Sequence, residues 1–365
     1  MAASPSHSDP RMPRPLAPSR SESRAPLILL ALLLAGCTPH RPAGERLYVS
    51  DEHGDQVVAI DPASGGVVDQ IAAGRRPRGL AMSPDGATLY VAISGSPIGG
   101  PGVDEDSLPP PDRKADGIAV VDLASAKVVR VLDVGHDPET FALSGDGRIL
   151  YVSNEDDGAI SQVATDGSRV PITAKVGDEP EGVALSGDGK SLFVACEGSD
   201  HVAMLDARTM KMIRTIRLSG RPRGALASRD GTSIFVSVEG AGKLAILDQA
   251  DGKPRKLLDL AQGDKDIRPM GIVEAPDGHL FVTTGRYGAV IEVDPKAGTI
   301  VRTIANVGAR PWGIGLTADG ATLVTANGPS GDVSLISRIS GKIIRKLNVG
   351  KGPWGIAGRS GSGAQ

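Results

Sequence analysis

The chain has 365 residues, of which 48 are glycine, 27 are proline and only 3% are aromatic, and its formal net charge is −3. Many glycines and prolines with few aromatic residues are typical of short strands joined by tight turns, and they argue against a helical bundle. Two cysteines are too few for a disulfide-rich scaffold. No cluster of Lys and Arg stands out, so we expect no nucleic-acid partner, because a phosphate backbone requires clustered positive charge.

The amino-terminal segment, residues 1–36, is expected to be a removable targeting signal. Arginines precede an apolar run at 25–35, which is too short for a comfortable membrane span. The tetrapeptide Leu34-Ala35-Gly36-Cys37 that follows resembles the lipobox of bacterial lipoproteins, and this resemblance implies that Cys37 is lipidated and becomes the first mature residue. The alternative is an ordinary cleaved signal with an incidental cysteine.

Lipid chains on Cys37 would hold the exported domain at a membrane, because each buried methylene contributes about 0.8 kcal/mol. In bacterial lipoproteins the residue after the cysteine directs sorting, and Thr38 rather than Asp implies the outer membrane, facing the periplasm. Residues 37–45 would then form a short tether.

From residue 47 onward one unit recurs seven times. Its clearest phrase is a β-rich tetrapeptide, found as LYVS (47–50), LYVA (89–92), LYVS (150–153), LFVA (192–195), IFVS (234–237), LFVT (280–283) and LVTA (323–326). A proline marks the link to the next unit, at Pro77, Pro138, Pro180, Pro222, Pro269, Pro311 and Pro353. Most of these prolines lie 42 residues apart, and a period of this length indicates a propeller, a solenoid or an array.

Each unit contains four predicted strands separated by turns. An open solenoid would require a polar capping unit at each end, but neither end of the repeats has one. We therefore predict an all-β fold at 46–358, a seven-bladed β-propeller with four antiparallel strands in each blade. The chain enters at a second strand and finishes with an isolated first strand, so the segment 354–357 should complete the first blade (47–72) and close the ring. Residues 359–365 are expected to be a disordered tail.

The repeats resemble the YVTN family of bacterial β-propellers over essentially all of 46–358. Phrases such as RRPRGLAMSPDG (75–86), DEPEGVALSGDG (178–189) and GPWGIA (352–357) are similar to the seven-repeat propeller associated with PQQ-dependent alcohol catabolism. That resemblance implies a periplasmic accessory protein without assigned chemistry. The lipobox and a long insert in the second blade depart from the family pattern.

Propeller geometry places two sets of side chains at one mouth of the central channel. The residue after each link proline forms the first set: Arg78, Glu139, Glu181, Arg223, Met270, Trp312 and Trp354. Residues five positions beyond the start of the β-phrase form the second set: Glu52, Glu155, Glu197 and Glu239. Together they predict a mixed polar and aromatic mouth that binds a ligand or a partner side chain.

Crowded carboxylates repel one another and need a neighbouring positive charge. Oxygen ligands favour calcium over zinc, so a calcium ion at the mouth is one possibility. In the simpler interpretation the glutamates are solvated loop residues, Arg78 and Arg223 pair with Glu139 and Glu181, and the tryptophans plug the channel.

The insert at 94–116 is long for a loop and belongs on the same face. It is expected to be either an acidic lid over the mouth or a disordered segment.

Catalytic motifs are absent from the sequence: neither Gly-x-Ser-x-Gly nor His-Glu-x-x-His occurs. Cys196 has no partner once Cys37 is lipidated, and it is expected to be a small buried residue. The leading hypothesis is therefore a non-catalytic, envelope-anchored binding propeller with a protein partner in the periplasm, accessory to the oxidation or transport of small molecules.

The alternative is a lactonase-like or cation-dependent hydrolase that uses Glu139, Glu181 and a bound cation at the channel mouth. A third possibility is an accessory protein that docks an electron-transfer partner.

Overall fold

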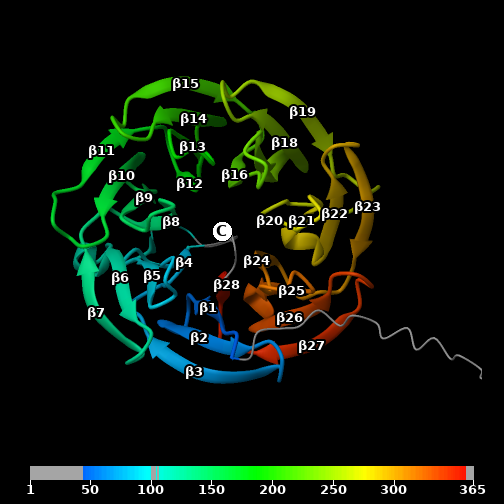
Figure 1. Ribbon diagram of the computed structural model, residues 1–365, viewed down its shortest axis with the longest axis horizontal. Helices are drawn as coiled ribbons and strands as arrows, with labels where there is room; N and C mark the ends of the chain where they lie inside the picture. Colours follow the sequence, from blue (N-terminus) through cyan, green and yellow to red (C-terminus); the bar gives the residue numbers. More distant parts are fainter. Residues whose placement is uncertain (1–43, 100–103, 105–106, 359–365) are drawn as a thin grey trace, which may run out of the picture. The chain divides into compact units, whose positions relative to one another are not determined.

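The computed structural model describes residues 44–99, 104 and 107–358, and seven four-stranded antiparallel sheets dominate this part of the chain. The sheets are arranged radially as blades, and their innermost strands lie nearest the central axis (Figure 1). The predicted all-β, seven-bladed propeller is thus confirmed. The expected signal segment, Cys37 and the tail at 359–365 lie outside the described residues.

The first blade joins the two ends of the repeat region. It consists of β28 (Pro353–Gly358), β1 (Leu47–Asp51), β2 (Gln56–Asp61) and β3 (Gly66–Ala72). The antiparallel pairing of β28 with β1 sets Ala357 opposite Tyr48 and Ile356 opposite Val49. The predicted closure by the last strand is therefore confirmed, and it leaves β1 without an open edge.

The other six blades follow in chain order, each running from an inner to an outer strand. Blades 2 to 4 consist of β4 (Leu80–Met82), β5 (Thr88–Ile93), β6 (Gly117–Asp122) and β7 (Lys127–Leu132); β8 (Pro138–Leu143), β9 (Ile149–Asn154), β10 (Ala159–Ala164) and β11 (Ile172–Lys175); and β12 (Pro180–Leu185), β13 (Ser191–Cys196), β14 (His201–Asp206) and β15 (Met212–Arg217). Blades 5 to 7 consist of β16 (Pro222–Ala227), β17 (Ser233–Val238), β18 (Lys243–Asp248) and β19 (Pro254–Asp259); β20 (Ile272–Glu274), β21 (Leu280–Thr283), β22 (Val290–Asp294) and β23 (Thr299–Ile304); and β24 (Pro311–Leu316), β25 (Thr322–Asn327), β26 (Asp332–Ser337) and β27 (Ile343–Asn348).

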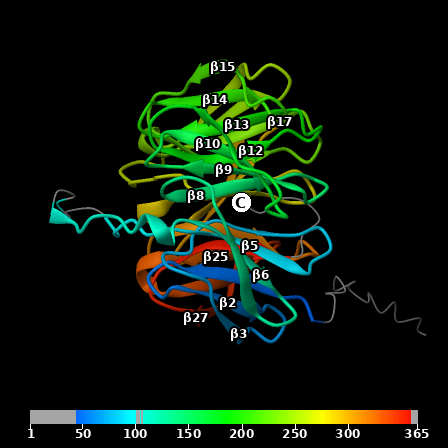
Figure 2. The ribbon, with the colours of Figure 1, turned by 90° about the vertical axis from the view of Figure 1, so that its left-hand side faces the viewer.

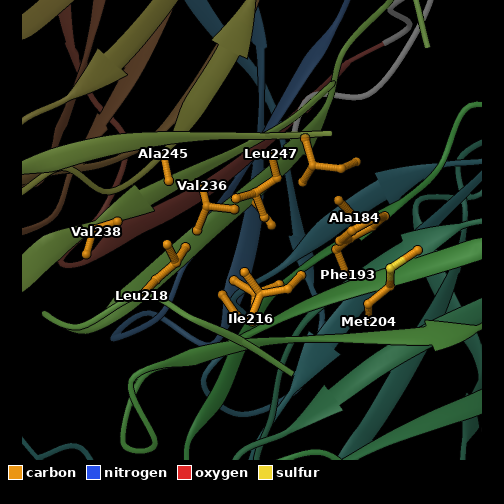
Figure 3. Packing of buried hydrophobic residues seen from close by; sticks show 13 residues of the cluster. Ala184, Phe193, Met204, Ile216, Leu218, Val236, Val238, Ala245 and Leu247 are labelled. Carbon is orange, nitrogen blue, oxygen red and sulfur yellow. The ribbon is translucent and has the colours of Figure 1, made fainter. Parts of the chain in front are cut away.

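The hydrophobic core is divided among the spaces between neighbouring blades. Seven clusters of buried side chains are found in the described residues, each shared by two adjacent sheets. Figure 3 shows the cluster in which Phe193 and Met204 of blade 4 lie beside Val236 and Leu247 of blade 5. Since every blade is covered on both faces, third strands such as β2, β6 and β18 are apolar on both faces, as their sequences predict, whereas β10 of blade 3 is more polar.

Short 3-10 helices occupy several loops: η2 (Arg113–Ala115), η3 (Glu239–Ala241), η4 (Gly285–Tyr287) and η5 (Gly328–Ser330). Three of them directly join a second strand to a third strand, which brings them to the same end of the blades as the link prolines. No helix in the described part of the chain is long and apolar enough to span a membrane.

Candidate functional site

Seven residues occupy equivalent positions around the channel wall, because each directly follows a link proline, at or just before the start of an innermost strand. In the order of blades 1 to 7 these wall residues are Trp354, Arg78, Glu139, Glu181, Arg223, Met270 and Trp312. All seven were anticipated from the repeat. Four consecutive blades, 2 to 5, therefore contribute charged side chains, and the remaining three contribute apolar ones.

A glycine follows the wall residue in every blade except blade 3, which has threonine. A Cβ atom built on Gly182 would lie 2.3 Å from the carbonyl oxygen of Arg223, and one on Gly313 would lie 2.4 Å from that of Trp354. Glycine is therefore required where adjacent innermost strands approach backbone to backbone. In blade 3, Thr140 instead donates its hydroxyl to the carbonyl of Glu181 at 2.8 Å.

Buried hydroxyl groups hold the carbonyls of the wall residues in place. Ser50 donates to the carbonyl of Arg78 at 2.7 Å, and Ser237 donates to that of Met270 at 2.7 Å. Both serines occupy the fourth position of the repeated β-phrase and are fully buried. The phrase thus encodes a hydrogen bond between neighbouring blades as well as a strand.

The residue before a link proline adopts an unusual backbone conformation in five blades. Positive φ angles between 44° and 60° occur at Arg76, Asp137, Glu179, Arg221 and Arg310. Such angles are uncommon outside glycine and cost about 1–3 kcal/mol each, so the surrounding contacts must hold them. The link-proline pattern marks these positions, but sequence reasoning did not select them as site residues.

Arg78 is the centre of the first charged cluster, and its side chain is only 3% exposed. It forms ion pairs with Glu139 and Asp137, and Glu155 lies 3.7 Å away. Burial opposes the charge of Arg78, but the two paired carboxylates outweigh burial and raise its pKa. Because Oε2 of Glu139 has no hydrogen-bond partner among the described residues, this cluster retains one unsatisfied buried acceptor.

Arg223 is the centre of the second charged cluster. Its guanidinium lies 2.9 Å from Glu181, 2.6 Å from Glu197 and 3.2 Å from Glu239. Arg221 adds a second ion pair to Glu197. Three carboxylates from blades 4 and 5 therefore converge on one partly buried guanidinium.

Three carboxyl groups of the two clusters have raised pKa values. Burial raises the pKa of Glu181 to about 8, against the opposing influence of Arg223. Burial and the neighbouring charge of Glu181 raise the pKa of Glu155 to about 7. Burial also places the pKa of Glu139 well above its ordinary value, although Arg78 opposes this. Groups that exchange protons near neutral pH are suited to acid–base catalysis.

The apolar part of the wall contains a stacked pair of tryptophans. The ring centroids of Trp312 and Trp354 are 6.4 Å apart with an interplanar angle of 20°. The guanidinium groups of Arg223 and Arg310 lie 5.0 Å and 4.5 Å from the centroid of Trp312. Aromatic and cationic groups therefore meet where the charged and apolar parts of the wall join.

A cavity of about 70 Å³ lies on this boundary. Its lining includes Glu181, Arg223, Met270, Trp312 and Trp354, together with the backbone of the glycines that follow them. This volume admits only a few non-hydrogen atoms, so part of a bound ligand would remain outside it.

The expectations for the glutamates of the second set have mixed outcomes. Glu197 and Glu239 share Arg223, whereas Glu52 pairs with Arg76 at 2.9 Å and Glu155 belongs to the Arg78 cluster. The prediction that Arg78 and Arg223 pair with Glu139 and Glu181 is confirmed. The interpretation of the glutamates as solvated is wrong for Glu139, Glu181 and Glu197, which are at most 4% exposed because ion pairs compensate for the lost water.

One group of three acids offers oxygen atoms close enough for a cation. Candidate ligand atoms of Asp137, Glu139 and Glu155 lie within 4.8 Å of one another. Oxygen donors suit calcium, as expected, but Arg78 already neutralises two of the three carboxylates. A bound metal is therefore not required to explain this cluster.

Both ends of the insert at 94–116 lie beside the Arg78 cluster. Ser94 donates a hydrogen bond to Asp137, and Arg113 lies 2.6 Å from Asp156. Arg76 donates to the carbonyl of Ser96 at 2.9 Å. The described part of the insert, in cyan at the left of Figure 2, extends outward from one face of the propeller.

Cys196 is fully buried, as expected, and burial raises its thiol pKa to about 12. Such a thiol is a structural group rather than a nucleophile.

Comparison with known proteins supports the fold more than a family. No family model matches the sequence. Over 125 residues the chain is 29% identical to the uncharacterized protein YncE of Salmonella typhi, and the same match is found in Salmonella typhimurium. The match covers 34% of this chain and only 29% of those relatives' length.

Solved structures with the same fold share little sequence with this chain. Kuenenia stuttgartiensis hydrazine synthase is 21% identical with a TM-score of 0.68, covering 81% of this chain and 93% of that one. The periplasmic gluconolactonase PpgL of Pseudomonas aeruginosa is 20% identical with a TM-score of 0.67, and the match covers 86% of this chain and 98% of that one. A candidate 6-phosphogluconolactonase of Bacteroides fragilis is 15% identical with a TM-score of 0.66 and the same coverage. At these identities the likeness shows the propeller fold alone.

Proposed function

We propose that the chain is a hydrolase of small lactones, with its reaction centre at the channel mouth. The observation that carries this proposal is the pair Glu181 and Arg223: a buried carboxyl with a pKa of about 8 lies 2.9 Å from a partly buried guanidinium on the wall of a cavity. A proton-exchanging group beside a fixed positive charge is what ester hydrolysis requires.

In ring opening, Glu181 transfers the proton and Arg223 stabilises the negative charge. A water molecule attacks the lactone carbonyl, and the ionised form of Glu181, which predominates above about pH 8, accepts the proton that the water loses. The N–H groups of Arg223 stabilise the negative charge that develops on the carbonyl oxygen. The ring C–O bond then breaks, and the departing oxygen takes the proton back from Glu181. The product is the open-chain hydroxy acid, and lactone and water are the only reactants.

Two further features support this proposal. The apolar surface of Trp312 and Trp354 can pack against the carbon skeleton of a ring-shaped substrate. Two of the propellers with similar structures are described as lactonases, although the low identities limit that support to analogy.

The test is hydrolysis of glucono-δ-lactone, which is neutral, and of 6-phosphoglucono-δ-lactone, which carries an anionic group, by the purified protein, followed with a pH indicator against the uncatalysed rate. Substituting Glu181→Gln should lower kcat about 10²- to 10⁴-fold, because the proton acceptor is removed. Glu274→Gln is a matched control, since Glu274 is a half-buried carboxyl with a raised pKa that does not line this cavity. Unchanged turnover in the Glu181 variant would locate the chemistry elsewhere, and no hydrolysis of a panel of lactones by the unchanged protein would reject the proposal.

A second function, a non-catalytic binding propeller, is favoured by one observation: ion pairs already engage the carboxylates of Glu181, Glu197 and Glu239. In this proposal the mouth and the projecting insert bind a periplasmic protein, consistent with the resemblance to propellers associated with PQQ-dependent catabolism. Cross-linking and capture from envelopes, comparing the chain with and without residues 97–111, would test it. A partner lost with the insert supports docking, and capture that is independent of the insert contradicts it.

We also propose that the chain is exported and lipid-anchored through Cys37, facing the periplasm at the outer membrane. Labelling with a palmitate analogue should mark the unchanged protein and not a Cys37→Ser variant. Label retained in the variant would contradict the assignment.

A further inference from the structure

We infer that Arg310, lying on the face of Trp312, binds an anionic group of the ligand that enters the mouth, either a carboxylate or a phosphate. The substrate would therefore be an acidic small molecule rather than a neutral one. This inference rests on the proposed function only where it names the substrate, because the binding itself needs no turnover.

Arg310 differs from the other arginines of the mouth in its ion pairing. Arg76 pairs with Glu52, Arg78 pairs with Glu139, and Arg223 pairs with three glutamates. Arg310 forms no ion pair or side-chain hydrogen bond with any residue that the structure describes. No described residue therefore competes with a ligand for its five N–H donors.

The surroundings of Arg310 favour an anion. The side chain is partly buried, and its guanidinium lies 4.5 Å from the ring centroid of Trp312. Arg223 lies over the same ring at 5.0 Å, so two positive groups share one aromatic ring. Burial and the positive charges of Arg223 and Arg286 lower the pKa of Arg310, against the influence of Glu239. A negatively charged group would relieve this repulsion.

The backbone holds Arg310 where it can act. Its φ angle is +49° and the next residue is Pro311, so the guanidinium is presented from a constrained link and not from a flexible loop. A planar guanidinium pairs with both oxygens of a carboxylate or phosphate. With the anion on Arg310, the rest of the ligand would reach Trp312 and the adjoining cavity, where Glu181 and Arg223 lie.

Tryptophan fluorescence can report this binding directly, because Trp312 and Trp354 are the only tryptophans in the sequence. Gluconate, 6-phosphogluconate and neutral glucose would each be titrated into the unchanged protein and into an Arg310→Gln variant. We expect at least one of the two anions to bind, and Arg310→Gln to weaken that binding roughly ten- to a hundredfold. Glucose should bind weakly and equally to both proteins.

The matched control is Arg255→Gln, which alters an arginine that pairs with Asp248 away from the mouth and should leave the anion affinities unchanged. Binding of gluconate and 6-phosphogluconate alike supports a carboxylate site, and binding of 6-phosphogluconate alone supports a phosphate site. The inference would be overturned if the Arg310→Gln variant bound the anions as tightly as the unchanged protein does, or if neither anion changed the fluorescence of the unchanged protein. Because these titrations need no catalysis, their outcome is separate from that of the lactone assay.

Discussion

The channel wall has two unlike parts built on the same backbone. Blades 2 to 5 present Arg78, Glu139, Glu181 and Arg223, whereas blades 6, 7 and 1 present Met270, Trp312 and Trp354. In both parts the side chain follows a link proline and precedes a close contact between innermost strands. The repeat thus determines where a side chain lies, and the identity of that one residue determines the chemistry of the wall.

The two parts are stabilised by different forces. In the charged part, each buried charge compensates for the desolvation of its partner. Removing one charge therefore leaves its partner buried and unpaired, which is destabilising. In the apolar part, stability comes from packing and depends on volume and contact. The following predictions test this contrast.

The largest effect is expected for Arg78→Met. Removing this guanidinium leaves buried Glu139 and Asp137 without their main partner, which should lower the free energy of unfolding by about 3–5 kcal/mol. Urea denaturation at pH 7 would measure the loss. The double variant Arg78→Met with Glu139→Met should recover much of it, because no unpaired carboxylate then remains at position 139. A double variant less stable than the single variant would show that the ion pair is not the source of the loss.

A smaller loss is expected in the apolar part, for Met270→Ala. Met270 is 4% exposed, and shortening it removes packing without leaving an unpaired charge. We expect a loss of about 2 kcal/mol, the lower end for a buried methionine, since the side chain already borders a cavity. The same urea experiment applies, and Met270→Leu should be nearly neutral. A loss equal to that of Arg78→Met would remove the distinction between the two parts.

The charged part should also make stability depend on pH. Glu155 has a folded-state pKa of about 7 and an ordinary value of 4.5, so the folded chain retains a proton that the unfolded chain releases. Its contribution is complete below about pH 4.5 and is lost as the pH rises through 7. The Tm should therefore fall between pH 5 and 8, and Glu155→Gln should reduce that fall by about 2–4 °C. An identical fall in the variant would indicate that Glu155 does not retain its proton.

The smallest effect is expected for Trp354→Leu. The stacked contact with Trp312 is lost, but the side chain is partly exposed and leucine restores part of the packing. A loss of about 1 kcal/mol is expected from urea denaturation. Trp312→Leu should cost more, because it also removes the contacts with Arg223 and Arg310. Equal losses would indicate that these cation–π contacts contribute little.

Much of the fold could be predicted because the repeat is local. The β-phrases, the link prolines and the isolated final strand together predicted seven four-stranded blades and the pairing of Trp354–Ala357 with the first blade, and the pairing of Tyr48 with Ala357 confirms the closure. The same spacing placed Glu181, Arg223, Trp312 and Trp354 on one channel mouth, and all four line the cavity.

The partners of these residues were harder to predict. Asp137, Arg221 and Arg310 each precede a link proline with a positive φ angle, and sequence alone does not show that angle. The solvated glutamates were expected because acidic loop residues are ordinarily exposed. Glu139, Glu181 and Glu197 are instead buried, because arginines from the same or neighbouring blades pair with them.

The sequence by itself determined the number of blades, the strand order and the residue type at each wall position, because these follow from a periodic pattern with short-range causes. Only the tertiary structure decided which charges meet, which carboxyls have raised pKa values and which arginine of the mouth has no ion-pair partner among the described residues. Those properties depend on distances of a few ångströms between side chains that different blades contribute, and they are set when the ring closes and excludes water from its wall.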